Sequence, residues 1–242
     1  MNAAIRRLPD ATALTRAALD LVAAAAREAV SQRGRFTIAL SGGSTPLPLY
    51  AAMAREGFGA PFAATQFFFG DERLVPVADR RNTFGAVSPV LFTPTAVPVG
   101  NIHPMPVELR PAELAAETYE AEVCDTLDAQ PGEIPRFDLI LLGVGPDGHT
   151  ASLFPDSPAL GETKKLVAAV PPPTTVEPHV PRLTFTLPLL NAARHVLFLA
   201  SAKGKEAALQ KALGPTPDPA VPASLVRPTD GDLTWLVADP AV

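Results

Sequence analysis

The stretch that decides the fold is Phe137-Asp-Leu-Ile-Leu-Leu-Gly-Val-Gly-Pro-Asp-Gly-His149. Its first six residues form an almost continuous apolar run, which is typical of a strand buried on both faces. The rest is a glycine-rich turn that carries polar side chains. Because strands buried on both faces belong to parallel sheets covered by helices, this stretch predicts an α/β fold. It also predicts a polar loop at the carboxyl end of a central strand.

The rest of the chain repeats this alternation. Further strand-like runs are found at 36–40, 65–69, 182–186, 195–199 and 233–237, and helical patterns at 11–33, from about Pro46, at 110–127 and at 205–213. The helix at 110–127 is expected to bring together Leu114, Thr118, Ala121 and Val123 on one face. Strands that alternate with helices predict a three-layer α/β sandwich with a mainly parallel central sheet. The sequence has neither an internal repeat nor a convincing linker, so we expect residues 1–242 to form a single domain.

Composition excludes several classes of protein. The 242 residues carry 20 Lys and Arg against 25 Asp and Glu, and a net charge of −5 argues against nucleic-acid binding but not against a small anionic ligand. The single cysteine excludes a disulfide framework, and the histidines lack metal-ligand spacing. The first residues lack a signal-peptide pattern, and no apolar run approaches the roughly 20 residues of a membrane span. We expect a cytoplasmic protein that binds no metal, cofactor, nucleic acid or membrane.

Polar sequences follow four of the predicted strands. Ser41-Gly-Gly-Ser-Thr-Pro46 follows the first, Gly70-Asp-Glu-Arg73 the second, 143–155 the third, and Ser201-Ala-Lys-Gly-Lys205 the strand that begins at His195. Ligands of open α/β sheets bind beyond the carboxyl ends of the strands. We therefore expect these four segments to form one site.

The segment 41–46 suits an anionic oxygen. Gly42 and Gly43 offer backbone N–H groups, Ser44 and Thr45 offer hydroxyls, and a helix is expected to begin directly afterwards. This combination is typical of phosphate sites. The alternative is an ordinary strand-to-helix turn that needs glycine for its backbone conformation.

His149 is the candidate general base, because an imidazole with a pKa near ~6.5 can take a proton from water at neutral pH. Candidate cations for a phosphate are Arg73, Arg182, Lys203 and Lys205. Asp71 could orient a ligand hydroxyl or a catalytic group. For these charged residues, solvated surface ion pairs are the alternative. A serine nucleophile of the α/β-hydrolase kind is disfavoured, because no Gly-x-Ser-x-Gly segment is present.

Taken together, these motifs resemble the glucosamine-6-phosphate isomerase/6-phosphogluconolactonase family. The matching segments are 41–46, 70–76, Asn82, 143–155, 181–186 and the region of 201–205. Within 148–155, Gly-His-Thr-Ala-Ser-Leu-Phe-Pro resembles the lactonases, since the deaminases carry a GHIAFNEP-like sequence there. Ala202 departs from the family, which usually has glycine at that position. The register makes Lys205 the matching lysine and Lys203 its neighbour.

The resemblance implies a deaminase/isomerase-like fold and hydrolysis of 6-phospho-D-glucono-1,5-lactone to 6-phospho-D-gluconate, a step of the oxidative pentose phosphate pathway. It implies His149 as the base and Asp71 as an orienting group. The implied substrate-binding residues are Gly42, Gly43, Ser44, Thr45, Arg73, Arg182 and Lys205. A monomer is expected, with a weak homo-oligomer as the alternative. The competing functions are a sugar-phosphate isomerase or amino-sugar deaminase on the same scaffold, and a sugar-phosphate-binding regulator, which would carry a helix-turn-helix that this chain lacks.

Overall fold

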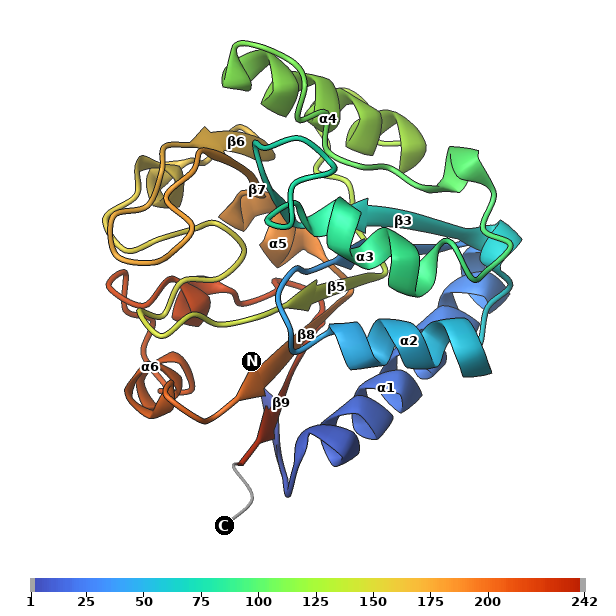
Figure 1. Cartoon of the computed structure of the whole chain (residues 1–242), viewed down its shortest axis with the longest axis horizontal. Helices are drawn as coiled ribbons and strands as arrows, with labels where there is room; N and C mark the ends of the chain where they lie inside the picture. Colours follow the sequence, from blue (N-terminus) through green and yellow to red (C-terminus); the bar gives the residue numbers. More distant parts are fainter. Residues whose placement is uncertain (1–2, 240–242) are drawn as a thin grey trace.

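The centre of the protein is a parallel β-sheet. The computed structural model describes residues 3–239, and no helix among them is long and apolar enough to cross a membrane. The sheet contains β1 (Ala4–Leu8), β2 (Phe36–Leu40), β3 (Thr65–Phe69), β5 (Leu139–Leu142), β8 (His195–Ser201) and β9 (Asp232–Ala238). Its six strands are ordered β1-β9-β8-β5-β2-β3, and every neighbouring pair is parallel (Figure 1).

A second, smaller sheet stands beside the first. It contains β4 (Asp71–Arg73), β7 (Arg182–Phe185) and β6 (Val167–Val170), in that order and antiparallel. The strand predicted at 182–186 is confirmed, but it belongs to this small sheet. The segment at 71–73 is a strand as well, although it is too short to show the alternation that identifies strands in a sequence.

Helices cover both faces of the large sheet, as the three-layer prediction requires. They are α1 (Ala11–Arg33), α2 (Leu47–Glu56), α3 (Thr83–Leu91), α4 (Ala112–Thr126), α5 (Leu187–Ala192) and α6 (Glu206–Ala212). The first three pack in one apolar cluster, and the last three pack with the small sheet in another. Figure 1 shows α1 and α2 on one side of the sheet and α4 with the small sheet on the other.

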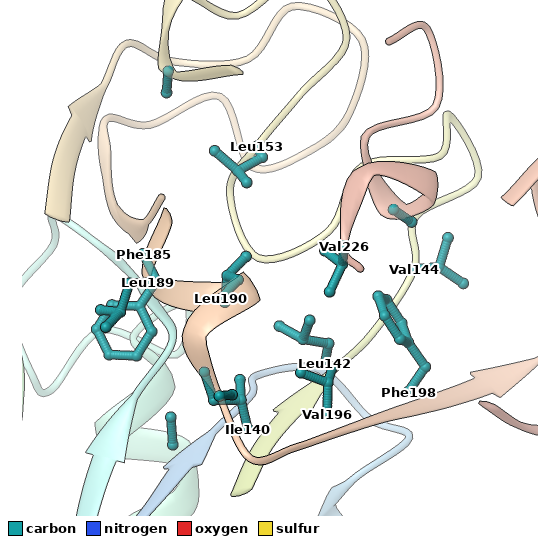
Figure 2. Packing of buried hydrophobic residues seen from close by; sticks show 14 of the residues in the cluster. Ile140, Leu142, Val144, Leu153, Phe185, Leu189, Leu190, Val196, Phe198 and Val226 are labelled. Carbon is teal, nitrogen blue, oxygen red and sulfur yellow. The ribbon is translucent and has the colours of Figure 1, made fainter. Parts of the chain in front are cut away.

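Alternate residues of each central strand enter the two clusters. In β5, Leu139 and Leu141 face the α1 side, whereas Ile140 and Leu142 face the α4 side. Figure 2 shows Ile140 and Leu142 packed beside Val196 of β8. The strand is therefore buried on both faces, which confirms the inference from its continuous apolar run.

The inner face of α4 differs from the prediction. Its buried residues are Ala115, Ala116, Tyr119 and Val123, and Leu114 is 45% exposed. The Tyr119 hydroxyl accepts a hydrogen bond from the Phe69 backbone N–H at 2.9 Å, which ties this face of the helix to β3. A large aromatic ring is stabilised by burial, and its hydroxyl then requires a hydrogen-bond partner. Tyr119 therefore sets the buried face of the helix, which is rotated by about one residue from the predicted face.

Candidate functional site

The small sheet places three of the predicted site residues on one surface. Asp71 lies opposite Thr184, and Arg73 lies opposite Arg182, in the antiparallel pair β4–β7. Residues directly opposite each other in such a pair point to the same face of the sheet. Asp71, Arg73 and Arg182 therefore share a face, while Glu72 points to the other.

Ser152 fixes the His149 loop to that face. Its hydroxyl donates a hydrogen bond to Asp71 Oδ2 at 2.6 Å, and its backbone N–H donates to Thr184 Oγ1 at 3.0 Å. Ser152 is fully buried, so water does not compete for these bonds. One residue thus joins the loop after β5 to both members of a cross-strand pair.

His149 is held by an acidic neighbour that the sequence did not single out. Its Nδ1 lies 2.5 Å from Asp147 Oδ1, and its ring centroid is 4.7 Å from that of Phe154. Burial alone would raise the pKa of Asp147, but the hydrogen bond and the charge of His149 outweigh it and lower that pKa to about 2. Thr175 Oγ1 donates to the other oxygen of Asp147 at 3.1 Å. Asp147 therefore stays ionised at neutral pH. Among residues 3–239, His149 forms its side-chain hydrogen bond through Nδ1, so Nε2 is available for a ligand.

Gly145 is required by this pair. A side-chain carbon at position 145 would overlap the ring of His149 and lie 2.7 Å from Asp147 Oδ1. The turn closes with a hydrogen bond from the Gly145 N–H to the His149 carbonyl at 2.8 Å. Gly145 thus lets the ring and the carboxylate fold back over the backbone.

Two arginines, the buried Arg182 and the half-buried Arg73, each have a guanidinium nitrogen that lacks an acceptor among the described residues. Arg182 is 2% exposed and donates to the Pro178 carbonyl at 3.1 Å, and its guanidinium carbon lies 5.2 Å from the Phe154 ring centroid. Arg73 donates to the Arg81 carbonyl at 2.8 Å. In the described part of the chain, Nε of both arginines is buried without a hydrogen-bond partner. Burial is the main reason that the pKa of Arg182 is lowered, and an anion would supply the missing acceptor.

The loop 41–46 is pinned at its base and open at its tip. The Tyr50 hydroxyl accepts from the Ser41 N–H at 2.9 Å and donates to the Ser41 carbonyl at 2.8 Å. Gly43 and Ser44 are exposed. A side-chain carbon at Gly42 would lie 2.9 Å from Thr83 Oγ1, so only glycine lets the loop approach that hydroxyl.

Thr83 is positioned by two residues, of which only Asn82 stood out in the sequence. Glu72 accepts hydrogen bonds from the backbone N–H groups of Thr83 and Phe84 at 2.7 and 2.8 Å. Asn82 Oδ1 accepts from the Gly85 N–H at 2.7 Å and so caps α3. Burial raises the pKa of Glu72, although its backbone hydrogen bonds act in the opposite direction. The amino end of α3 is thereby fixed against the loop 41–46.

The lysine that the resemblance favours does reach the site. Lys205 Nζ donates to the Val144 carbonyl at 2.6 Å, within the His149 loop, and burial lowers its pKa. Lys203 is exposed. As to metals, the part of the chain between residues 3 and 239 contains no group of three or more His, Cys, Asp or Glu side chains placed to hold an ion.

The sequence-predicted residues thus gather at the carboxyl edge of the large sheet, and their hydrogen bonds distinguish two carboxylates. Asp71 is bound by Ser152, and Asp147 is bound by His149. Asp147 could have been noticed in the sequence, since it stands two residues before His149 in a tight glycine turn. Glu72 gave no such indication, because it contacts the start of a helix eleven and twelve residues away in the chain.

A parallel α/β sheet with an acid–histidine pair and two arginines at its carboxyl edge has the features of an enzyme that acts on an anionic substrate. The chain belongs to the family described as glucosamine-6-phosphate isomerases/6-phosphogluconolactonase, whose model matches residues 9–235. The family and the fold expected from the sequence are therefore confirmed.

Within the family, the relatives are lactonases. The chain is 42% identical over 221 residues to the 6-phosphogluconolactonase of Synechocystis, covering 91% of this chain and 89% of that protein. It is 41% identical over 213 residues to the human 6-phosphogluconolactonase, covering 86% and 80% of the two chains. The crystal structure of the 6-phosphogluconolactonase from Thermotoga maritima has a TM-score of 0.84 and 33% identity, over 98% of this chain and 100% of that one.

Proposed function

We propose that this chain hydrolyses 6-phospho-D-glucono-1,5-lactone to 6-phospho-D-gluconate, with His149 activating the attacking water. The single observation that carries the proposal is the His149–Asp147 pair, anchored through Ser152 to the face that carries Arg73 and Arg182. A base beside two arginines, of which Arg182 is buried, suits a substrate with an electrophilic carbonyl and a phosphate. The relatives named as 6-phosphogluconolactonases support the same reaction.

The chemistry needs a base but no covalent nucleophile. His149 Nε2 takes a proton from water while the oxygen of that water attacks C1 of the lactone. Asp147 holds the Nδ1 proton and stabilises the imidazolium that forms. When the bond from C1 to the ring oxygen breaks, His149 returns the proton to the leaving oxygen. The products are a carboxylic acid, which ionises at neutral pH, and the free 5-hydroxyl.

The remaining roles divide between the two ends of the substrate. Arg73, Arg182 and Lys205 hold the phosphate, and Asp71 orients the sugar ring. The N–H groups of Gly42 and Gly43, together with the hydroxyls of Ser44 and Thr45, contact anionic or carbonyl oxygen. Each charge-assisted hydrogen bond on the phosphate contributes roughly 1.5–3 kcal/mol of binding free energy. This binding energy holds C1 of the lactone in position for attack by the water.

We further propose that the chain works as a single domain over residues 1–242, as a monomer in the cytoplasm, without a metal or an organic cofactor. The experiment that tests the function compares two activities of the purified chain. We expect acid release from freshly prepared 6-phosphogluconolactone at neutral pH, far above the spontaneous rate, and no ammonia from glucosamine 6-phosphate. Ammonia release without lactone hydrolysis would favour the deaminase instead.

A further inference from the structure

A cluster of arginines lies at the amino edge of the large sheet, away from the loops described above. Arg33 ends α1, Arg136 precedes β5, and Arg194 precedes β8. With Arg35, they line a cavity of about 460 Å³. A strand of five residues rises about 16 Å, so the length of the strands separates this cavity from the His149 loop at their other end. The proposed lactonase reaction gives these arginines no role.

One carboxylate at the centre of the cluster is already saturated. Asp138 accepts hydrogen bonds from the backbone N–H and the hydroxyl of Thr37, at 2.8 and 2.9 Å, and from Arg33 Nε at 2.9 Å. Asp138 is buried, whereas the cavity opens beyond it. Its carboxylate oxygens are therefore already hydrogen-bonded to Arg33 and to Thr37 of β2.

The two other acids on the cavity wall are also engaged. Asp128 pairs with Arg35 at 2.8 Å. Glu133 accepts from the backbone N–H of Gln130 at 3.2 Å. Neither is hydrogen-bonded to Arg136 or Arg194, the two cations that complete the wall.

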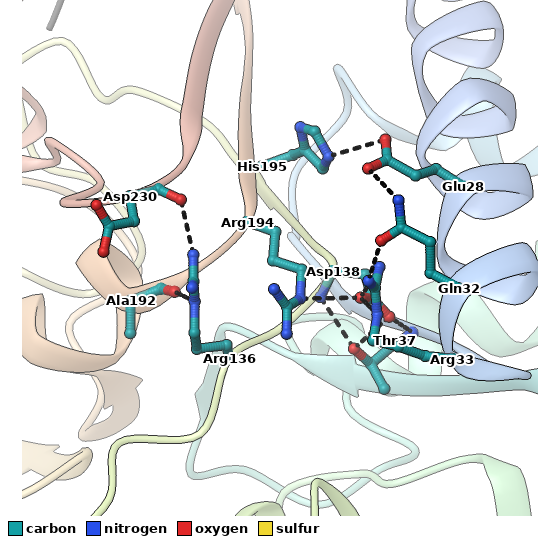
Figure 3. Close-up of polar contacts among 10 residues, drawn as sticks. All are labelled: Glu28, Gln32, Arg33, Thr37, Arg136, Asp138, Ala192, Arg194, His195 and Asp230. Atoms are coloured by element: carbon teal, nitrogen blue, oxygen red, sulfur yellow. Dashed lines mark hydrogen bonds and ion pairs between the residues drawn. The ribbon is translucent and has the colours of Figure 1, made fainter.

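Arg136 and Arg194 carry charges that no carboxylate of their own offsets. Arg136 donates to the carbonyls of Ala192 and Asp230, at 2.8 and 2.7 Å, which are neutral acceptors. The Arg194 side chain makes no hydrogen bond to residues 3–239, and its Nε lies 3.5 Å from Asp138, which it shares with Arg33. Figure 3 shows Arg194 between Arg136 on one side and Asp138 with Arg33 on the other. Burial, and then the nearby charges of Arg33 and Arg136, lower the pKa of Arg194, while the charges of Asp138 and Glu28 act in the opposite direction.

Part of the cavity lining is apolar. It includes Leu127, Ala129, Ile134 and Pro135, and Ile134 is 44% exposed although it is large and hydrophobic. A second hollow shares Arg33, Arg136 and Arg194 with this cavity, but Glu28, Asp230 and Asp232 line it as well. The first cavity, whose acids are already engaged and whose lining includes apolar residues, therefore suits an anion with an apolar group better.

We propose that this cavity is a binding site for a phosphate monoester that carries a flat apolar group, of which a nucleoside monophosphate is the simplest example. The phosphate binds between Arg136 and Arg194, whose planar guanidinium groups match its oxygens. The apolar group lies against Ile134 and Pro135. Binding of the dianion relieves the repulsion among the arginines that the structure brings together.

Isothermal titration calorimetry of the purified chain with AMP tests the proposal, with adenosine as the uncharged comparison. We expect saturable binding of AMP and none of adenosine. Arg194→Ala should weaken AMP binding about tenfold or more, the loss of one charge-assisted pair. Arg194→Lys keeps the charge and should recover only part of the lost AMP affinity. This variant serves as the test if Arg194→Ala is poorly folded.

Two further variants distinguish binding in this cavity from a diffuse charge effect and from binding at the candidate active site. Arg6→Ala removes the same charge from the exposed edge strand β1, and Arg182→Ala removes a cation from the candidate active site. Both should bind AMP within about twofold of the unaltered chain. An equal loss in Arg6→Ala would show that the charge effect is diffuse, and a loss in Arg182→Ala alone would place AMP at the active site. Either result, or no binding at millimolar AMP, overturns the proposal.

Discussion

At the scale of single residues, the candidate site depends on Asp147 more than on any group that stood out in the sequence. Its carboxylate holds Nδ1 of His149 and is itself held by Thr175. Both contacts are products of the turn at 143–149 and of a loop that arrives from elsewhere in the chain. A sequence shows the three residue types, but only the folded chain shows that they meet.

The lowered pKa of Asp147 makes a prediction about stability. Its folded pKa of about 2 lies below the ordinary value of 3.8, so the ionised carboxylate stabilises the fold fully above about pH 4. That stabilisation is lost as the pH falls from about 4 toward 2. We expect Asp147→Asn to lower the midpoint of thermal unfolding at about pH 6, and the difference from the unaltered chain to shrink below about pH 4. Calorimetry over this range measures it, with the exposed Asp20→Asn as the control; a difference that grows in acid would contradict the account.

Arg73 should affect binding rather than chemistry. Its buried Nε has no hydrogen-bond acceptor among residues 3–239, so we expect it to bind the phosphate. Removing this charge-assisted contact should raise KM for the phosphorylated lactone about tenfold. We expect Arg73→Ala to leave hydrolysis of glucono-1,5-lactone, which lacks the phosphate, almost unchanged. Steady-state kinetics on both substrates measure the split. Equal losses on the two lactones would exclude a phosphate role for Arg73.

At the scale of elements, the long apolar strands and the long amphipathic helix could be predicted, whereas short or exposed elements could not. The helix at 11–33 is confirmed residue for residue, with the Asp10 side chain at its start and Gly34 at its end. β4 has three residues, and β1 is almost wholly exposed, so neither shows an apolar pattern. α3 contains Gly85 and Pro89, which are poor helix formers, and is held by its caps and by packing.

The cap of α3 should therefore matter for the site as well as for the fold. Asn82→Ala removes the side-chain acceptor for the Gly85 N–H and should destabilise the chain by about 1 kcal/mol. Asp10→Ala removes the equivalent cap of α1, where Asp10 accepts from the Ala13 N–H at 2.8 Å, at a similar cost. We expect only Asn82→Ala to raise KM, because α3 carries Thr83 against the loop 41–46. Urea unfolding and steady-state kinetics of the two variants measure these effects. Identical kinetics in the two variants would show that α3 does not position the loop 41–46 for substrate binding.

At the scale of the whole molecule, the parallel sheet divides the protein into two chemical edges. The carboxyl edge was predictable, because ligands of such sheets bind there and the motifs followed the strands. The arginine cluster at the amino edge was not, since its members precede three different strands that lie far apart along the chain. Of the small antiparallel sheet, which carries Asp71, Arg73 and Arg182, only the strand at 182–186 was predicted, because β4 is too short to show an alternation.

The shared sheet also predicts cooperative unfolding. The only tryptophan, Trp235 in β9, stacks on Phe198 of β8 with ring centroids 3.7 Å apart. Its fluorescence reports on the packing between β8 and β9, whereas far-UV circular dichroism reports on all helices. If residues 1–242 form one domain, the two signals should change with the same midpoint in urea. Two separate transitions would divide the chain into independent units.

The central claim is that His149 activates the water that opens the lactone. The most direct test is the rate of 6-phosphogluconolactone hydrolysis by His149→Ala, with circular dichroism to show that the variant is folded. The account predicts that kcat falls about 100-fold or more, toward the spontaneous rate, because general-base catalysis is lost while Arg73 and Arg182 still bind the phosphate. Turnover close to that of the unaltered chain, in a folded variant, would contradict it.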